Sequence, residues 1–146
     1  MQKWTSKPLR FVHDPKAPIV SATLELIGVD QRVPSFSARV YLNNPRVDEE
    51  SGTATRGYAG FFSFFGHGEN CWGDEGHCEI PGPVSPFDKR AESTAHPANI
   101  TVDITTALTA VLDKEQIRVT ILAWAASGDD STDPLVFDEL MLVTYS

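Results

Sequence analysis

The sequence has 146 residues, a net charge of −8 and 41% hydrophobic residues. Its length and apolar content predict one folded domain, spanning residues 1–146, with a single core. The acidic surface repels phosphate backbones and anionic lipid, so nucleic acid is disfavoured as a partner.

No stretch reaches the roughly 18 apolar residues of a membrane span. The first residues lack the apolar middle of a signal peptide, so we expect a soluble chain. The compartment stays open, because export alongside a partner would leave the same sequence.

Short apolar segments separated by glycine and proline occupy most of the chain. Their alternating apolar side chains predict half-buried strands. These strands are expected at residues 22–29, 35–42, 58–65, 100–105, 117–124 and 136–145, with a further short strand near 9–12. Residues 105–116 have helical spacing over one or two turns and are expected to form a connector.

These strands predict an all-β fold, an antiparallel two-sheet β-sandwich of jelly-roll-like character. Each alternating strand has one apolar face, which must be buried against a second sheet. Residues 66–99 have no periodicity and many glycines and prolines, which predicts one long irregular loop. A loop of that length is uncommon in a compact domain unless it serves a function, so we expect the functional site there.

The segment "GFFSFF" (residues 60–65) is aromatic on both faces of its expected strand. Side-chain alternation places Phe61 and Phe65 on one face and Phe62 and Phe64 on the other. A sandwich strand needs only one apolar face, so we expect Phe62 and Phe64 to need a second cover. Each ring left in water forgoes about 2 kcal/mol of burial. The cover is either the chain's own long loop or the surface of a partner.

The long loop contains His67, Cys71, His77 and Cys78. Histidine and cysteine are suitable ligands for Cu(I) or Zn(II), and the neighbouring glycines would let the loop wrap an ion. A disulfide between Cys71 and Cys78 is the competing interpretation, because the two are close in sequence and would pair in an oxidising compartment. Two free thiols are the third alternative, and all three stay open. The hypothesis for metal binding is that the two histidines and the two thiols hold copper transiently.

The sequence contains none of the common catalytic motifs. It contains no nucleophile elbow, phosphate-cradling glycine loop or H-E-x-x-H helix, so we expect no catalytic activity of the chain on its own. The aspartates within residues 127–134 lack the EF-hand pattern and are expected to form a solvated hairpin tip. Residues 99–101 are a formal glycosylation acceptor at the start of an expected strand.

Three groups of residues carry a resemblance to a known family. They are Tyr58, Ala59, Gly60, Phe61 and His67, then Thr105, Thr106 and Leu108, and then Val119, Thr120 and Ile121. In this order they resemble the C-terminal β-sandwich domain of tyrosinases and polyphenol oxidases. The resemblance implies a domain that packs over a type 3 copper site and assists copper delivery. The helices that carry the copper ligands of the catalytic domain are absent from this sequence, and the Cys/His loop looks closer to tyrosinase helper proteins.

Two functions follow as hypotheses. In the first, the chain is a non-catalytic part of a tyrosinase-like oxidoreductase, and it docks on a type 3 copper catalytic domain, in cis or in trans, through Phe62, Phe64 and Trp72. In the second, it is a free-standing module that binds a carbohydrate or another small neutral ligand and contains a structural disulfide. There Trp72 is the expected stacking platform.

Overall fold

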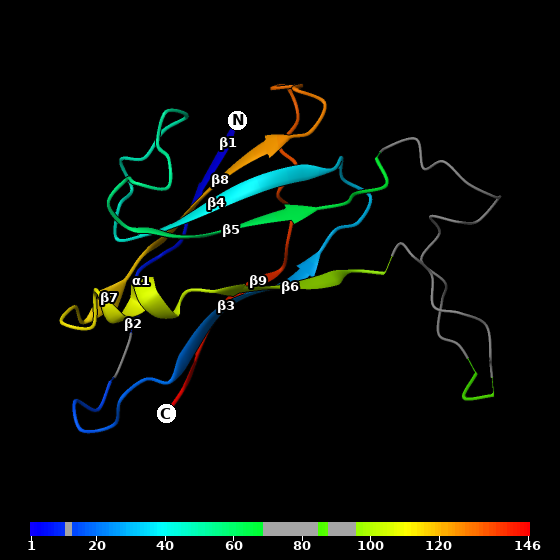
Figure 1. Ribbon diagram of the computed structural model, residues 1–146. Coiled ribbons are helices and arrows are strands. Elements are labelled where there is room, and N and C mark those ends of the chain that lie inside the picture. The colour runs from blue at the N-terminus through cyan, green and yellow to red at the C-terminus, as the bar shows by residue number, and fades with distance from the viewer. Residues whose placement is uncertain (11–12, 69–84, 88–95) are drawn as a thin grey trace.

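The computed structural model describes residues 1–10, 13–68, 85–87 and 96–146, and these residues form an antiparallel β-sandwich (Figure 1). One sheet has the strand order β1 (Gln2–Thr5), β8 (Val119–Ala125), β4 (Phe36–Leu42) and β5 (Tyr58–Phe64). The other has the order β6 (Ala98–Asp103), β3 (Ser21–Val29) and β9 (Glu139–Tyr145). A short pair joins β2 (Leu9–Arg10) to β7 (Gln116–Ile117), and the helix α1 (Thr105–Thr109) follows β6. The predicted all-β fold is confirmed.

The core lies between the two larger sheets. On β3, Ala22, Leu24 and Leu26 are fully buried, as their alternation predicts. Leu24 is paired with Val102 on β6 and with Leu142 on β9, so one row of apolar side chains crosses the whole three-stranded sheet. Each fully buried side chain of this size contributes about 1.5–3 kcal/mol relative to exposure in water. Among the described residues, no helix is long and apolar enough to span a membrane.

The edge strand β1 was not expected from the sequence. Three of its four residues are polar and only Trp4 is large and apolar. One apolar residue does not make the alternating pattern that predicts a strand. Trp4 packs edge-on against Phe137, with 5.0 Å between the ring centroids. The Gln2 side chain also accepts from the Leu135 main-chain N–H at 2.7 Å and donates to the Leu135 carbonyl oxygen at 3.3 Å. These contacts attach β1 to the segment that leads into β9.

The strand expected at residues 117–124 is divided at Arg118 into β7 and β8. The Asn43 N–H donates to the Arg118 carbonyl oxygen, and the Arg118 N–H donates to Asn43 Oδ1, both at 2.8 Å. Asn43 has a φ of 52°, a conformation that asparagine tolerates better than most residues. Ile117 therefore belongs to the short pair and Val119 to the four-stranded sheet, and both are fully buried.

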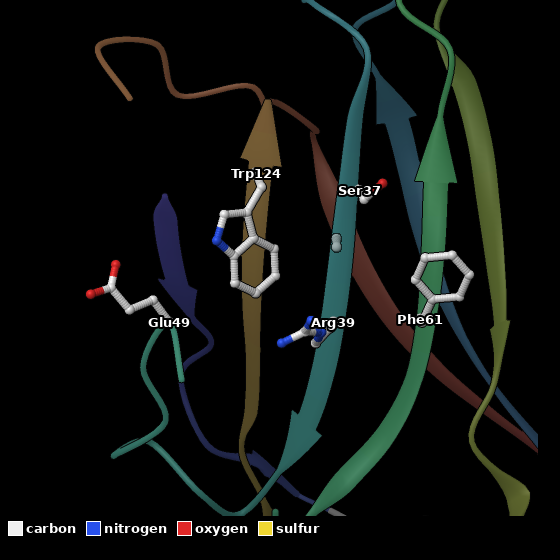
Figure 2. Close-up of a pocket in the computed structure, with 6 residues that line it drawn as sticks. Ser37, Arg39, Glu49, Phe61 and Trp124 are labelled. Atoms are coloured by element: carbon white, nitrogen blue, oxygen red, sulfur yellow. The ribbon is translucent and has the colours of Figure 1, made fainter. Parts of the chain in front are cut away.

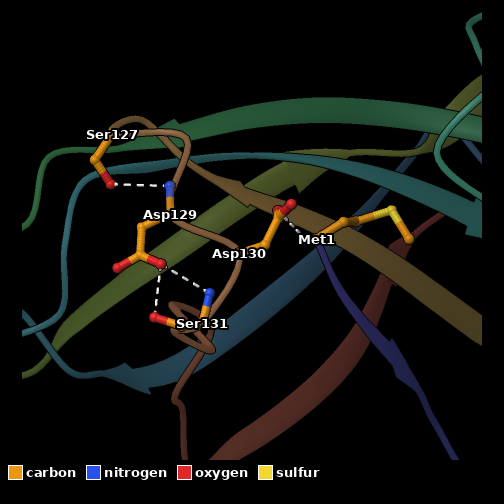
Figure 3. Close-up of polar contacts among 5 residues, drawn as sticks. All are labelled: Met1, Ser127, Asp129, Asp130 and Ser131. Atoms are coloured by element: carbon orange, nitrogen blue, oxygen red, sulfur yellow. Dashed lines mark hydrogen bonds and ion pairs between the residues drawn. The ribbon is translucent and has the colours of Figure 1, made fainter.

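The aspartate-rich segment that follows β8 is exposed, as expected, but it is not the tip of a hairpin. It leads from β8 in one sheet toward β9 in the other, and these two strands are not paired. Figure 3 shows Asp129 Oδ1 accepting from the N–H and the hydroxyl of Ser131, at 2.8 and 2.6 Å. These two hydrogen bonds lower the pKa of Asp129 below its ordinary value. Asp130 forms an ion pair of 2.6 Å with the Met1 ammonium group.

Candidate functional site

The two aromatic faces of β5 have different surroundings. Phe62 is buried in the core and Phe64 packs against it, and their ring centroids lie 6.0 and 5.4 Å from that of Phe36 on the neighbouring strand β4. Phe61 and Phe65 are 60% and 86% exposed. The expectation that Phe62 and Phe64 need a second cover is therefore wrong, because the register of β5 on β4 directs them into the core of the sandwich. The outward pair is Phe61 and Phe65.

The connection between β4 and β5, residues 43–57, folds over part of the outer face of the four-stranded sheet. Val47 is 2% exposed and packs with Tyr41 and Leu122 in a small second cluster on this face. The Tyr41 hydroxyl donates to the Ser51 carbonyl oxygen at 2.7 Å. The Lys3 ammonium group donates to the Val47 carbonyl oxygen at 2.8 Å. These contacts fix the connection against the sheet, and burial raises the pKa of Tyr41 above its ordinary value.

Beside this connection the same face of the sheet contains an open groove of about 360 Å³. It is lined by Ser37, Ala38, Arg39, Glu49, Phe61 and Trp124. Arg39 is paired with Phe61 on β5, and Ser37 is paired with Trp124 on β8, so three neighbouring strands form its floor. Figure 2 shows the labelled side chains on the side of β4, β5 and β8 that faces away from the three-stranded sheet. We call this feature the sheet groove.

The charged side chains of the sheet groove are Arg39 and Glu49. Arg39 Cζ lies 4.8 Å from the ring centroid of Trp124, which is within the range of a cation–π interaction. Arg39 Nη1 also donates to the Ser51 carbonyl oxygen at 2.7 Å, so the guanidinium is held from two sides. Glu49 reaches the groove from the connection between β4 and β5. The lining residues therefore sum to zero net charge, although the chain carries −8.

The side chains that line the sheet groove offer several kinds of contact to a ligand. The rings of Trp124 and Phe61 offer apolar surface, Arg39 offers hydrogen-bond donors, and Glu49 offers acceptors. The hydroxyl of Ser37 lies 3.1 Å from that of Ser63. The groove fits a ligand that combines an apolar face with hydroxyl groups.

The ends of the predicted long loop are attached to the turn between β3 and β4. The His67 N–H donates to the Gln31 carbonyl oxygen at 2.8 Å, and the Gly68 N–H donates to the Val33 carbonyl oxygen at 3.0 Å. The side-chain amide of Gln31 donates to the carbonyl oxygen of His96. A single residue of the turn therefore binds the chain on both sides of residues 69–95. His67, the first residue of the predicted metal site, lies at this attachment.

The rest of the predicted metal site lies outside the described residues. This holds for Cys71, His77 and Cys78, with the predicted disulfide, and also for Trp72. Within the described ranges, no group of three or more His, Cys, Asp or Glu side chains could hold a metal ion. Copper binding and the disulfide therefore stay predictions from the sequence.

Two comparisons with known proteins gave no match. No model of a known protein family matches the chain, and a search of curated protein sequences found no similar one. The fold and the sheet groove are therefore the basis for inferring function.

Sequence patterns did not predict the charged and aromatic residues of the groove lining, which are Arg39, Glu49, Phe61 and Trp124. Trp124 did carry a signal, because alternation places it on the face opposite Ile121, where a half-buried strand should be polar. Phe61 carried the same signal on β5. Arg39 looked like an ordinary solvated residue of β4. Nothing in the sequence indicated that Glu49, from an irregular connection, would come close to them.

Proposed function

We propose that this domain is a non-catalytic recognition module that binds a neutral carbohydrate in the sheet groove. The observation that carries the proposal is the placement of Trp124, Arg39 and Phe61 on three adjacent strands of one open sheet face, with Glu49 beside them. Sugar rings have apolar C–H faces that stack on aromatic rings, and their hydroxyl groups bind charged and polar side chains.

Charge selects among ligands of this kind. The chain has a net charge of −8, which disfavours polyanions. In the groove the positive charge of Arg39 and the negative charge of Glu49 cancel. A neutral ligand can therefore contact both side chains without electrostatic repulsion from either. Neutral glycans are therefore favoured over sulfated or carboxylated ones.

A glycan array tests the proposal. We expect the purified domain to bind neutral glycans, and we expect Trp124→Ala and Phe61→Ala to weaken that binding while Phe65→Ala leaves it unchanged. Phe65 is the matched control, because it is an exposed ring next to β5 that does not line the groove. Binding restricted to acidic glycans, absence of glycan binding, or equal binding by all three variants would contradict the proposal.

A second candidate is the docking domain of a type 3 copper enzyme that the sequence resembles. The observation that favours it is the outward pair, Phe61 within β5 and Phe65 directly after it, which are 60% and 86% exposed. Exposed apolar surface of this kind is typical of protein interfaces. In this function the domain shields the copper site of a catalytic domain, in cis or in trans. The contact is made through Phe61 and Phe65, in place of the Phe62 and Phe64 expected from the sequence.

Co-expression with a tyrosinase catalytic domain tests the second candidate. We expect a complex that survives size-exclusion chromatography, and we expect the double variant Phe61→Ala/Phe65→Ala to abolish it. Copper analysis of the reduced domain, purified without chelator, tests the proposed assistance in copper delivery. No complex and no copper uptake would count against this candidate, and neither result would affect the carbohydrate proposal.

A further inference from the structure

We infer that the ligand of the sheet groove is a chain of several sugar units bound across the strands, and not a single sugar. This inference rests on the proposed function and specifies the class of carbohydrate. It follows from the separation of the two aromatic residues and from what lies between them.

Trp124 and Phe61 belong to strands on opposite sides of β4. Two strand spacings separate β8 from β5, which is about 10 Å across the sheet. The two residues are also staggered along the strands, because Phe61 is paired with Arg39 whereas Trp124 is paired with Ser37, two residues earlier on β4. One sugar ring is about the size of a phenyl ring and cannot stack on both at once.

The space between the two rings is polar. Figure 2 shows Glu49 at one end of the groove, then Trp124, then Ser37 and Arg39 on β4, and then Phe61. A chain that crosses the strands would stack one unit on Trp124 and another on Phe61, and the units between them would place hydroxyl groups against Arg39 and Ser37. Arg39 is already fixed by Trp124 and by the Ser51 carbonyl oxygen, so little side-chain entropy is lost on binding.

Glu49 adds selectivity at the Trp124 end. Its carboxylate accepts hydrogen bonds from sugar hydroxyl groups and repels a carboxylate on the ligand. The unit stacked on Trp124 is therefore a neutral hexose or pentose and not a uronic acid. The inferred ligand class is a neutral linear oligosaccharide or polysaccharide.

Calorimetric titration with glucose, xylose and mannose and with their β-1,4-linked oligomers of two to six units tests the inference. We expect the longer oligomers to bind at least about tenfold more tightly than the monosaccharide, the gain of one additional stacked ring. Phe61→Ala should remove most of this gain and leave the affinity for the shortest ligands unchanged. Phe65→Ala should change neither the gain in affinity with chain length nor the affinity for the shortest ligands. The melting temperature of each variant shows whether it folds.

The outcomes separate the inference from the proposed function. If a monosaccharide binds as tightly as the longest oligomer, or if Phe61→Ala leaves the dependence on chain length intact, the inference is wrong and the carbohydrate proposal stands. If none of these sugars binds and the glycan array is also negative, the proposed function fails and the inference fails with it. A Glu49→Gln variant that binds glucuronic acid oligomers no better than the original domain overturns the role given to Glu49.

Discussion

The guanidinium of Arg39 lies against the indole of Trp124, with 4.8 Å between Cζ and the ring centroid. The two residues come from neighbouring strands, β4 and β8, and stand on the outer face of the four-stranded sheet. Because Arg39 also donates to the Ser51 carbonyl oxygen, it joins the aromatic surface of the groove to the connection that contains Glu49. Arg39 is thus the central residue of the proposed site.

Replacing Arg39 tests this position directly. Arg39→Gln should lower the free energy of unfolding by about 1 kcal/mol through loss of the cation–π contact and the hydrogen bond. It should also weaken carbohydrate binding about tenfold. Arg39→Lys should retain only part of the stability and part of the carbohydrate affinity, because lysine lacks the planar group that stacks on the indole. Urea denaturation and calorimetry measure the two effects.

The control for this substitution is Arg56→Gln. Arg56 is an exposed residue of the same connection, and its carbonyl oxygen, which the substitution retains, accepts from Asn44. We expect no change in stability or binding beyond about 0.5 kcal/mol. Equal effects of Arg39→Gln and Arg56→Gln would show that net charge, and not the contact with Trp124, is responsible.

The two faces of β5 should differ sharply in their contribution to stability. Phe62→Ala should cost about 3–5 kcal/mol, because it leaves a cavity in the core. Phe61→Ala should cost less than about 1 kcal/mol, because the ring is 60% exposed. Chemical denaturation of both variants measures the difference. A larger cost for Phe61→Ala would mean that Phe61, and not Phe62, faces the core.

The Tyr41 hydroxyl should help to hold the connection over the sheet. Tyr41→Phe removes the hydrogen bond to the Ser51 carbonyl oxygen, which still accepts from Arg39, so we expect a cost of only about 1 kcal/mol. Tyr145→Phe is the matched control, because Tyr145 is 57% exposed at the end of β9. If the two variants lose equal stability, the hydroxyl of Tyr41 has no special role.

The raised pKa of Tyr41 should make the stability of the protein depend on pH. Burial raises the pKa of Tyr41 above its ordinary value, and the Arg39 cation opposes this shift in part. The folded state therefore binds the phenolic proton more tightly than the unfolded state does. This contribution is complete below the unfolded-state pKa of about 10 and is lost as the pH rises through the folded-state pKa. Denaturation curves above this pH should show a smaller loss for Tyr41→Phe than for the original protein.

Gly66 should be required where the chain leaves β5. A Cβ at this position would collide with the main chain of Val33 and Pro34, and the Gly66 N–H donates to Ser35 Oγ at 3.1 Å. Gly66→Ala should therefore cost about 1–3 kcal/mol. Gly52→Ala should be neutral or slightly stabilising, since a Cβ there meets nothing within 4 Å. Thermal denaturation compares the two, and equal melting temperatures would argue against the close approach of residues 33–34.

Alternation of apolar side chains predicted most of the sandwich because it reflects burial directly. The rows on β3 and β4 that include Leu24 and Val40 are fully buried. Alternation does not reveal a strand that is held by other contacts, as in β1, whose Trp4 packs on Phe137. It also could not find the break at Arg118, which depends on a hydrogen bond to Asn43, 75 residues earlier.

The site was harder to predict than the fold, because it depends on register across three strands. The sequence showed that "GFFSFF" is aromatic on both faces, but it could not show which face meets the core. That choice follows from the pairing of Phe62 with Ala38, a residue whose small inward side chain leaves room for the ring. Once Phe62 is inside, Phe61 must be outside, next to Arg39.

The most direct test of the central claim is a nuclear magnetic resonance titration of the isotope-labelled domain with the neutral oligosaccharide that binds tightest on the array. The account predicts saturable shifts of the Trp124 indole N–H and of the backbone amides of Ser37, Arg39 and Phe61, with Glu25 on the three-stranded sheet unaffected. Shifts confined to the three-stranded sheet, or no shift at the indole of Trp124, would contradict it.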